Sequence, residues 1–309
     1  MTKERVKGEQ YGTVAWHDRG VPFLTPAEVA ELPEDLVGKI ARLEGILRDL
    51  NRVVVAFSGG ADSAFVAGVA HRVLGTRQCH AVTAVSPSLA GSEEADCRSL
   101  AVEWGLRWTP VDTAEMERAA YRANDIDRCY HCKAELMDVV GPIAEGEGAT
   151  VVLGVNLDDL ADHRPGQRAA IERGAVFPLV QAGFSKDDVR RASQVMGLRT
   201  WDKPAAACLA SRVPYGTSVS VEILSRVDRA EAALHGLGFR QVRVRHYGET
   251  ARIEVEETFL ETAVARRSAI IEAVKGAGYR YVTLDLEGFR SGNLNDAVGE
   301  GSSSGTRHS

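Results

Sequence analysis

Apolar and polar residues follow two periods along this chain, one typical of buried strands and the other of amphipathic helices. Short apolar runs alternate with stretches whose apolar residues recur at helical spacing. The expected strands are 53–57, 81–85, 108–111 and 149–155, and the expected helices are 36–50, 64–73, 92–104, 133–140 and 185–196. Strands that alternate with helices predict an α/β fold with a doubly wound, mostly parallel sheet.

The pattern changes near residue 219, where two strands follow one another without a helix between them. The expected elements are helix 221–237, strands 241–246 and 251–255, helix 258–275 and strand 281–286. These elements predict a smaller C-terminal α+β domain. The predicted segments are an N-terminal extension (1–34), the α/β domain (35–214), the α+β domain (215–292) and a disordered Gly/Ser-rich tail (293–309).

The composition is that of a globular protein, since 44% of the 309 residues are hydrophobic and 26% are charged. No apolar run is long enough to cross a bilayer, and the N-terminus lacks the apolar core of a signal peptide. We therefore expect a cytoplasmic protein without membrane contacts. The net charge of −6 gives no indication of a nucleic-acid partner. Among the five cysteines, Cys79 and Cys97 are expected to be small core residues.

The stretch VVVAFSGGADSAF places a glycine- and serine-rich loop between a buried strand and a helix. Gly59 and Gly60 allow a tight turn and a close approach of the backbone to a ligand. Ser58 and Ser63 add hydroxyl donors, and Asp62 is placed either to bind a metal ion or to cap the helix. Because N–H groups at a helix start favour anions, the loop predicts phosphate binding, with a plain turn as the alternative. Its spacing matches neither Walker A nor Gly-x-Gly-x-x-Gly.

Two other expected strands also end in polar residues, and ligands of such sheets bind at the carboxyl ends of strands. Ser86 follows the second strand, and the loop after the fourth strand contains Asn156, Asp159 and Asp162. Carboxylates this close in sequence repel one another unless a cation lies between them. Two interpretations stay open, a Mg²⁺ ion bound together with ATP phosphates and a solvated acidic loop.

Three cysteines lie in polar or small-residue segments. Cys208 is in DKPAAACLASR between Lys203 and Arg212, and nearby cations favour the nucleophilic thiolate, although a buried structural cysteine is the alternative. Cys129 and Cys132 form a Cys-x-x-Cys just before an expected helix. Such a pair suits a redox couple, half of a zinc site or two packed thiols.

Together these motifs resemble the LarE family of PP-loop ATP pyrophosphatases over about residues 35–292. The segments SGGADS, NLDDLADHRPG and VEILSRVDRAEAALHGLGFRQVRVRHYGETARIEV carry the resemblance, and DKPAAACLASR is its most telling part. The resemblance implies a Rossmann-like PP-loop domain and sulfur insertion during synthesis of the nickel-pincer nucleotide cofactor. ATP adenylates a carboxylate of pyridinium-3,5-biscarboxylic acid mononucleotide and pyrophosphate leaves. A sulfur nucleophile then displaces AMP to give a thiocarboxylate.

The resemblance also implies roles at the ATP site. Asp62 and Lys186 act at the phosphates, with Mg²⁺ as the metal ion, and Arg212 belongs to the same site. The family tends to form homo-oligomers, so a homo-oligomer is implied here as well.

Sulfur donation has two versions in the family. In one, Cys208 forms a thioester and is consumed, leaving dehydroalanine. In the other, Cys129, Cys132 and Cys208 hold a [4Fe-4S] cluster whose open iron carries an additional sulfide. Soft thiolates suit iron–sulfur clusters, and a second cysteine pair for zinc is absent from the sequence, so we favour the cluster version.

The C-terminal domain carries basic residues suited to a charged nucleotide substrate. The valines of QVRVRH face one side of the strand, so Arg243 and Arg245 face the other, where two guanidiniums suit a phosphate. The alternative is a solvated edge of mixed charge. Arg290 follows the last strand, and Glu231, on the preceding helix, matches only loosely the carboxylates that bind metal in the family.

Three other functions remain possible from the residues. A PP-loop enzyme that thiolates tRNA is disfavoured by the acidic balance and by the absence of paired Cys-x-x-Cys modules. An amide-forming ligase similar to NAD synthetase needs no cysteine near its acyl site, so Cys208 discriminates against it. A nucleotide-binding sensor without catalysis would not need SGGADS, Lys186 and the acidic loop together.

Overall fold

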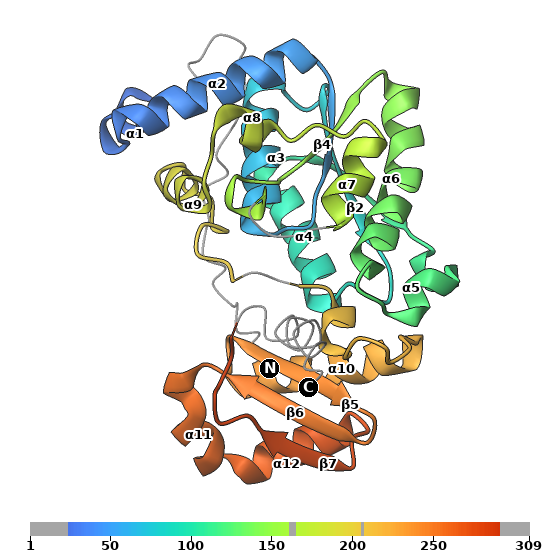
Figure 1. Cartoon of the computed structure of the whole chain (residues 1–309). Coiled ribbons are helices and arrows are strands. Elements are labelled where there is room, and N and C mark those ends of the chain that lie inside the picture. Colours follow the sequence, from blue (N-terminus) through green and yellow to red (C-terminus); the bar gives the residue numbers. More distant parts are fainter. Residues whose placement is uncertain (1–23, 161–164, 205–206, 291–309) are drawn as a thin grey trace, which may run out of the picture.

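The computed structural model describes residues 24–160, 165–204 and 207–290, and it has an α/β body and a smaller α+β body (Figure 1). The larger sheet consists of β1 (Val53–Ala56), β2 (Cys79–Val85), β3 (Arg107–Asp112) and β4 (Thr150–Leu153). Its strands are all parallel, in the order β3-β2-β1-β4. The predicted parallel sheet is therefore confirmed, and the order reverses beside β1.

The helices of the α/β body agree with the predicted ones where these are long. They are α1 (Pro26–Glu31), α2 (Glu34–Leu50), α3 (Ala61–Leu74), α4 (Gly91–Trp104), α5 (Ala119–Ala123), α6 (Arg128–Glu147), α7 (Pro165–Glu172), α8 (Pro178–Ala182) and α9 (Lys186–Val195). The short helices α1, α5, α7 and α8 were not predicted, because a helix of one or two turns shows too few repeats of its period.

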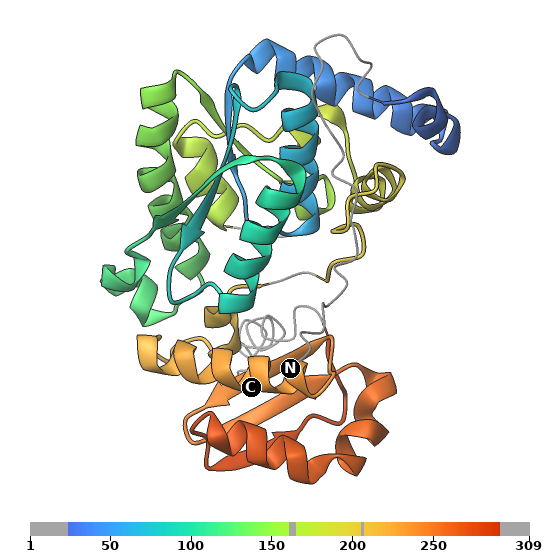
Figure 2. The same ribbon diagram turned by 180° about the vertical axis from the view of Figure 1, so that it is seen from behind.

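Helices cover both faces of the sheet, as a doubly wound fold requires. Along β1, Val53 and Val55 enter a core shared with α2, α3, α4 and α9. Val54 points the other way, into a core shared with α6 and α7. Figure 2 shows α4 in front of the sheet, whereas α6 and α7 lie on the far side. Each face of the sheet is thus buried by its own layer of helices.

The start of the described chain packs onto the first of these cores. Leu24 and Leu32 are buried there, and α1 between them begins with a capping box made by Thr25 and Glu28. These residues fall inside the segment predicted as an N-terminal extension. The predicted tail and Asp162 lie outside the described residues. None of the helices described is long and apolar enough to span a bilayer.

The α+β body begins with a long helix and contains a small mixed sheet. Its elements are α10 (Val221–Gly236), β5 (Val242–Tyr247), β6 (Thr250–Val255), α11 (Leu260–Ala265), α12 (Arg267–Gly276) and β7 (Tyr281–Leu284). β5 and β6 are antiparallel, whereas β6 and β7 are parallel. The single predicted helix 258–275 is wrong in one respect. It is divided at Arg266, whose backbone (φ −96°, ψ 17°) ends α11 before α12 starts.

The loops that follow β1 and β2 face the α+β body (Figure 1). At this boundary the start of α4 contacts α10, where Asp228 accepts a hydrogen bond from the backbone of Gly91. Leu209, in the segment that leads into the smaller body, donates its backbone N–H to Ser88 O at 2.8 Å. The carboxyl edge of the parallel sheet therefore lies between the two bodies.

Gly154, just after β4, lies directly against the first turn of α3. A Cβ added at Gly154 would lie 2.5 Å from Ser63 N and 2.6 Å from the carbonyl carbon of Asp62. These are backbone atoms that cannot turn aside, so Gly154→Ala should lower the free energy of unfolding by about 1–3 kcal/mol or more, measured by urea denaturation. Gly45→Ala in α2 is the matched control, since its added Cβ meets no other part of the protein within 4 Å and no proline follows it. A helix-interior alanine should there stabilise the protein by about 0.5–1 kcal/mol, and equal effects at both sites would contradict the account.

Candidate active site

The glycine- and serine-rich loop after β1 has the geometry of a preformed anion site. Ser63 Oγ accepts a hydrogen bond from Ser58 N–H at 3.2 Å and donates one to Gly60 O at 3.2 Å. The Ser58 and Ser63 hydroxyl oxygens are 3.0 Å apart. Gly59 has φ +70°, a conformation that favours glycine. The loop is thus closed on itself by its serines, and α3 begins immediately after it, with its first N–H groups available to an anion.

Asp62 connects this loop to the chain that follows β4. Its carboxylate accepts a 3.0 Å hydrogen bond from Asn156 Nδ2, across 94 positions of sequence. Asn156 is buried, and it exchanges two hydrogen bonds with Asp159: Asn156 N–H donates to Asp159 Oδ2 and Asp159 N–H donates to Asn156 Oδ1. Three residues predicted separately from two strand ends therefore form one polar network at the point where the strand order reverses.

Burial raises the pKa of Asp62, and the carboxylate of Asp159 raises it further. The hydrogen bond from Asn156 and the charges of Lys186 and Arg190 oppose this shift. The carboxylates of Asp62 and Asp159 and the side-chain oxygen of Asn156 suit Mg²⁺. This ion commonly binds one or two carboxylates and completes its shell with phosphate oxygens and water. No set of three or more His, Cys, Asp or Glu side chains suited to a metal ion occurs in the part of the chain described. A Mg²⁺ ion here thus fits as a companion of bound phosphate.

Lys186 is the first residue of α9, and the predicted capping box is confirmed. Ser185 Oγ accepts from Asp188 N–H, and the Asp188 side chain accepts from Ser185 N–H. A second contact was not predicted: Lys186 N–H donates to Asp158 Oδ2 at 2.6 Å. The acidic loop after β4 therefore also fixes the helix start that carries Lys186, and it brings the lysine within electrostatic reach of Asp62.

Lys203 is a contact of the phosphate loop that the sequence did not reveal. Its Nζ donates to Gly59 O at 3.1 Å, to Glu93 Oε2 at 2.8 Å and to Asp96 Oδ2 at 2.6 Å. All three ammonium hydrogens are thereby used. Lys203 ties the carbonyl of the loop to α4, and it does so from the same segment that leads to Cys208.

Ser86, predicted to bind a cofactor, lies at the end of β2 in a buried polar network. Its hydroxyl donates to the carboxylate of Glu115 and accepts from Ser88 N–H at 3.1 Å. The Ser88 hydroxyl in turn contacts that of Tyr121, which is completely buried. Tyr121 packs in the same apolar cluster as Cys132 and Cys208. Ser86 thus lies on the cysteine side of the sheet edge.

The structure brings the three predicted cysteines together. Cys132 and Cys208 pack against one apolar cluster, while Cys129 is exposed. Burial raises the pKa of Cys132 to about 12, and the neighbouring thiols of Cys208 and Cys129 add to the shift. The Cys-x-x-Cys does not precede the helix, as predicted, but lies in its first turn, because α6 begins at Arg128. Three thiols that converge in this way suit an iron–sulfur cluster by their donor chemistry, although their side chains do not already form a ligand set.

The cations expected to act on Cys208 are balanced by carboxylates. Lys203 pairs with two carboxylates of α4. Arg212 donates to Cys208 O at 3.2 Å, but its guanidinium forms a bidentate ion pair with Glu231, with both N–O distances 2.9 Å. The expectation that these two charges activate the thiol is therefore not supported by their contacts. The buried cation that interacts with Cys208 and Cys129 is Arg128.

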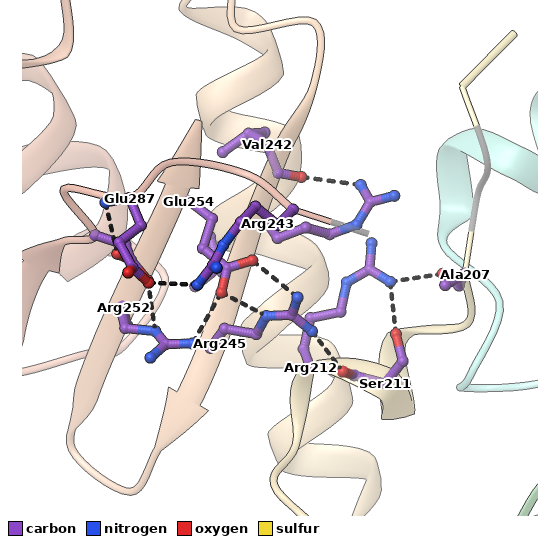
Figure 3. Close-up of polar contacts among 12 residues, drawn as sticks. Ala207, Ser211, Arg212, Val242, Arg243, Arg245, Arg252, Glu254 and Glu287 are labelled. Carbon is purple, nitrogen blue, oxygen red and sulfur yellow. Dashed lines mark hydrogen bonds and ion pairs between the residues drawn. The ribbon is translucent and has the colours of Figure 1, made fainter. Parts of the chain in front are cut away.

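A layer of buried charged residues lies where the two bodies meet (Figure 3). Arg245 makes a bidentate ion pair with Glu254 (3.0 and 2.8 Å) and donates to Ser211 O at 2.9 Å. Arg252 also pairs with Glu254, at 2.9 Å. Arg243 lies over the ring of Phe289, with 5.2 Å between its guanidinium carbon and the ring centroid. The predicted shared face of the two β5 arginines is therefore present, and it is buried rather than solvated.

Four arginines, Arg212, Arg243, Arg245 and Arg252, lie here with three carboxylates, Glu231, Glu254 and Asp285. Burial lowers the pKa of Arg243 to about 10, and the nearby charge of Arg212 lowers it further. The Glu231 carboxylate already has two partners, because it pairs with Arg212 and also accepts a hydrogen bond from Val244 N–H at 2.9 Å. Arg290, another predicted contact, pairs with Glu287. Crowded, buried guanidiniums of this kind would be stabilised by an anion.

Asp62→Asn tests the electrostatics of the ATP site. The pKa of Asp62 is raised in the folded protein, so folding favours the protonated form and stability falls as the pH rises from the ordinary aspartate pKa through the folded one. The ionised carboxylate therefore costs stability at neutral pH. Asp62→Asn should raise the melting temperature at pH 7, and the gain should vanish at acidic pH, as measured by thermal unfolding in metal-free buffer. Asp202→Asn, at an exposed position, should have no such pH-dependent effect, and a neutral-pH loss of stability in Asp62→Asn would contradict the assignment.

Comparisons with known proteins identify the family. Residues 44–135, which contain the phosphate loop, match the NAD synthase family. An uncharacterized protein of Synechocystis sp. is 46% identical over 84% of this chain and 98% of its own. An uncharacterized protein of Methanocaldococcus jannaschii is 24% identical over 82% of this chain and 98% of its own.

A relative with an assigned activity is also present. The pyridinium-3,5-bisthiocarboxylic acid mononucleotide synthase of Lactiplantibacillus plantarum is 38% identical over 85% of this chain and 96% of its own. The match covers 264 residues, more than the α/β body alone contains. The chain therefore belongs to the LarE family of PP-loop proteins.

Proposed function

We propose that this protein is an ATP-dependent sulfur transferase that converts pyridinium-3,5-biscarboxylic acid mononucleotide into its bisthiocarboxylic acid. A substrate carboxylate oxygen attacks the α-phosphorus of ATP and pyrophosphate leaves. A sulfur nucleophile then attacks the acyl carbon, forming the C–S bond as the C–O bond to AMP breaks. The observation that carries the proposal is a closed glycine- and serine-rich loop together with Cys132 and Cys208 in one apolar cluster, with Cys129 one helical turn before Cys132, in a chain related to the synthase named above.

The ATP half of the reaction is assigned to residues at the carboxyl ends of β1 and β4. The loop 58–63 binds the phosphates through its N–H groups and serine hydroxyls. Asp62 and Asp159 would hold Mg²⁺, which would supply positive charge to the pyrophosphate leaving group, and Lys186 adds a further positive charge. The closed hydrogen-bond geometry of the loop supports this assignment, because it needs little rearrangement to receive phosphate.

The mononucleotide phosphate is assigned to the buried arginine layer, chiefly to Arg243 and Arg245. The segment 35–214 then acts as the ATP-binding domain and 215–292 as the substrate domain. The support is electrostatic, since guanidiniums crowd at this boundary and the pKa of Arg243 is lowered by burial and by its neighbours. Arg212 and Glu231 hold the two domains in register through their bidentate pair.

The sulfur half is assigned to Cys129, Cys132 and Cys208 as ligands of a [4Fe-4S] cluster. Bound there, the cluster would supply an open iron at which sulfide is carried. The residues of this chain do the rest: they place the cysteines beside the ATP site and exclude water with the apolar cluster around Tyr121. The alternative is that Cys208 itself is the sulfur source. We further expect a cytoplasmic homo-oligomer, which size-exclusion chromatography with light scattering would test.

The mass of Cys208 after turnover distinguishes the two sulfur sources. Conversion of a cysteine to dehydroalanine removes H₂S, a loss of about 34 Da by the stoichiometry of the step. We expect Cys208 to keep its mass through many turnovers of anaerobically purified protein, and Cys129→Ala or Cys132→Ala to abolish turnover. Cys79→Ala is the matched control, since this cysteine is buried away from the site. Loss of 34 Da with single turnover would reject the cluster version while leaving sulfur transfer intact.

The substrate assignment is tested best at Arg243. Arg243→Gln removes a charge-assisted contact and should weaken mononucleotide binding by about 1.5–3 kcal/mol, measured by calorimetry, with ATP affinity unchanged. Arg245→Gln should weaken binding similarly but should also destabilise the protein, because Glu254 is completely buried and loses its bidentate partner. Arg280→Gln, an exposed arginine of the same domain, is the control. Equal losses of ATP and mononucleotide affinity in Arg243→Gln would reject the assignment.

A further inference from the structure

Arg128 is a buried cation that donates hydrogen bonds to neutral oxygens in the described part of the chain. Only 4% of the residue is exposed. One of its guanidinium nitrogens donates to Asn124 Oδ1 and to Ala210 O, the latter at 2.9 Å. The guanidinium carbon lies 5.8 Å from the centre of the Tyr215 ring. Within the described ranges, no aspartate or glutamate forms an ion pair with Arg128.

A charge buried in this way is costly unless an opposite charge compensates it. The sulfur atoms of Cys208 and Cys129 are the chargeable groups with the largest favourable interactions with the Arg128 guanidinium. Cys129 is adjacent in sequence, and Cys208 is two residues before the carbonyl that Arg128 contacts. Lys203 and Arg212, two other cations nearby, are already balanced by carboxylates, and Lys133 acts on Cys132. The sulfur atoms of Cys208 and Cys129 are therefore well placed to balance Arg128.

Holding the cysteine segment in place is a separate task, done largely by Asn124. This residue is completely buried and has φ +57°. Its side-chain amide donates to the carbonyl oxygens of Val213 (3.2 Å), Pro214 (2.8 Å) and Thr217 (2.9 Å). Asn124 thus fixes the chain after Cys208 and also accepts a hydrogen bond from Arg128, without contributing charge.

We propose that Arg128 is the positioning residue that makes the cysteine cluster a binding site for a small sulfur anion, hydrosulfide. Its positive charge holds the anion beside Cys208 and opposes its release to solvent. The inference rests on the proposed function in that the anion is the sulfur to be transferred, but the charge itself is testable without ATP or the mononucleotide.

The test compares two alkylating reagents at Cys208 in metal-free, reduced protein. Iodoacetate is an anion and iodoacetamide is neutral, and peptide mass spectrometry gives the rate of each at a single pH. The ratio of the two rates cancels the fraction of thiolate, so it reports the local electrostatic potential. We expect Arg128→Gln, which keeps a donor for Ala210 O, to lower the ratio about fivefold. Arg128→Lys, which keeps the charge, should retain most of the wild-type ratio.

Two controls separate charge from structure. Val219→Ala loosens the segment, because Val219 is buried in the same apolar cluster as Cys208, but it leaves both hydrogen bonds of Arg128 intact, so its ratio should stay near that of the wild type. Arg122→Gln removes an exposed arginine of neighbouring α5, which contacts Met116 O, and should also leave the ratio unchanged. An unchanged ratio in Arg128→Gln, or an equal fall in Val219→Ala, would overturn the proposal.

The wild-type protein supplies a second measure that does not depend on the folding of any variant. Its iodoacetate-to-iodoacetamide ratio at Cys208 should exceed that of a cysteine in an unstructured peptide, and added salt should reduce the excess. A ratio at or below the peptide value would also overturn the proposal. Failure of the wild type to insert sulfur, with the ratio high, would instead reject the proposed function and leave the charge of Arg128 established.

Discussion

The contact between Gly154 and the first turn of α3 is the constraint on which the rest of the site depends. A side chain at Gly154 would collide with backbone atoms of Asp62 and Ser63, so only glycine allows the end of β4 to come this close to the phosphate loop. The close approach lets Asn156 reach Asp62 and brings the acidic loop to the start of α9. Two strand ends thus become one site because one residue lacks a side chain.

Charge balance distinguishes the parts of the boundary that are structural from those that await a ligand. Lys203 and Arg212 are each matched by carboxylates and hold segments together. Asp62 is hydrogen-bonded to a neutral amide, and Arg128 contacts neutral oxygens. Buried charges with neutral partners cost stability, which a bound ion of opposite charge would recover. On this basis we propose Asp62 for the metal–phosphate side of the site and Arg128 for the sulfur side.

Much of the fold was predictable because burial imposes a period on the sequence. The β1 and β2 strands and the long helices α2, α3, α4 and α10 follow it closely. The start of α6 was missed because CYHC carries no apolar repeat, and the division at Arg266 was missed because the period continues across it. Features that depend only on residues close together in the sequence, such as the capping box at Ser185, could be predicted.

The site was predictable only where its residues follow strand ends. The loop 58–63 and Asn156 have that signal, since parallel strands gather their carboxyl ends at one edge. Lys203 had none, because its contact with Gly59 spans 144 positions of sequence. Arg128 was equally hidden: nothing in the sequence distinguishes it from a solvated arginine, and its role depends on burial and on which oxygens it contacts. The arginines of β5 were predicted to share a face, but their pairing with Glu254 follows from the strand register.

The central claim is that one site activates a pyridinium carboxylate with ATP and then transfers sulfur to it. Isotope exchange between labelled pyrophosphate and ATP measures the first step by itself. The account predicts exchange that requires both Mg²⁺ and pyridinium-3,5-biscarboxylic acid mononucleotide, and that survives removal of the cysteines because no sulfur takes part in it. Exchange that ignores the mononucleotide but responds to deamido-NAD or to tRNA, or no exchange with any acceptor, would contradict it.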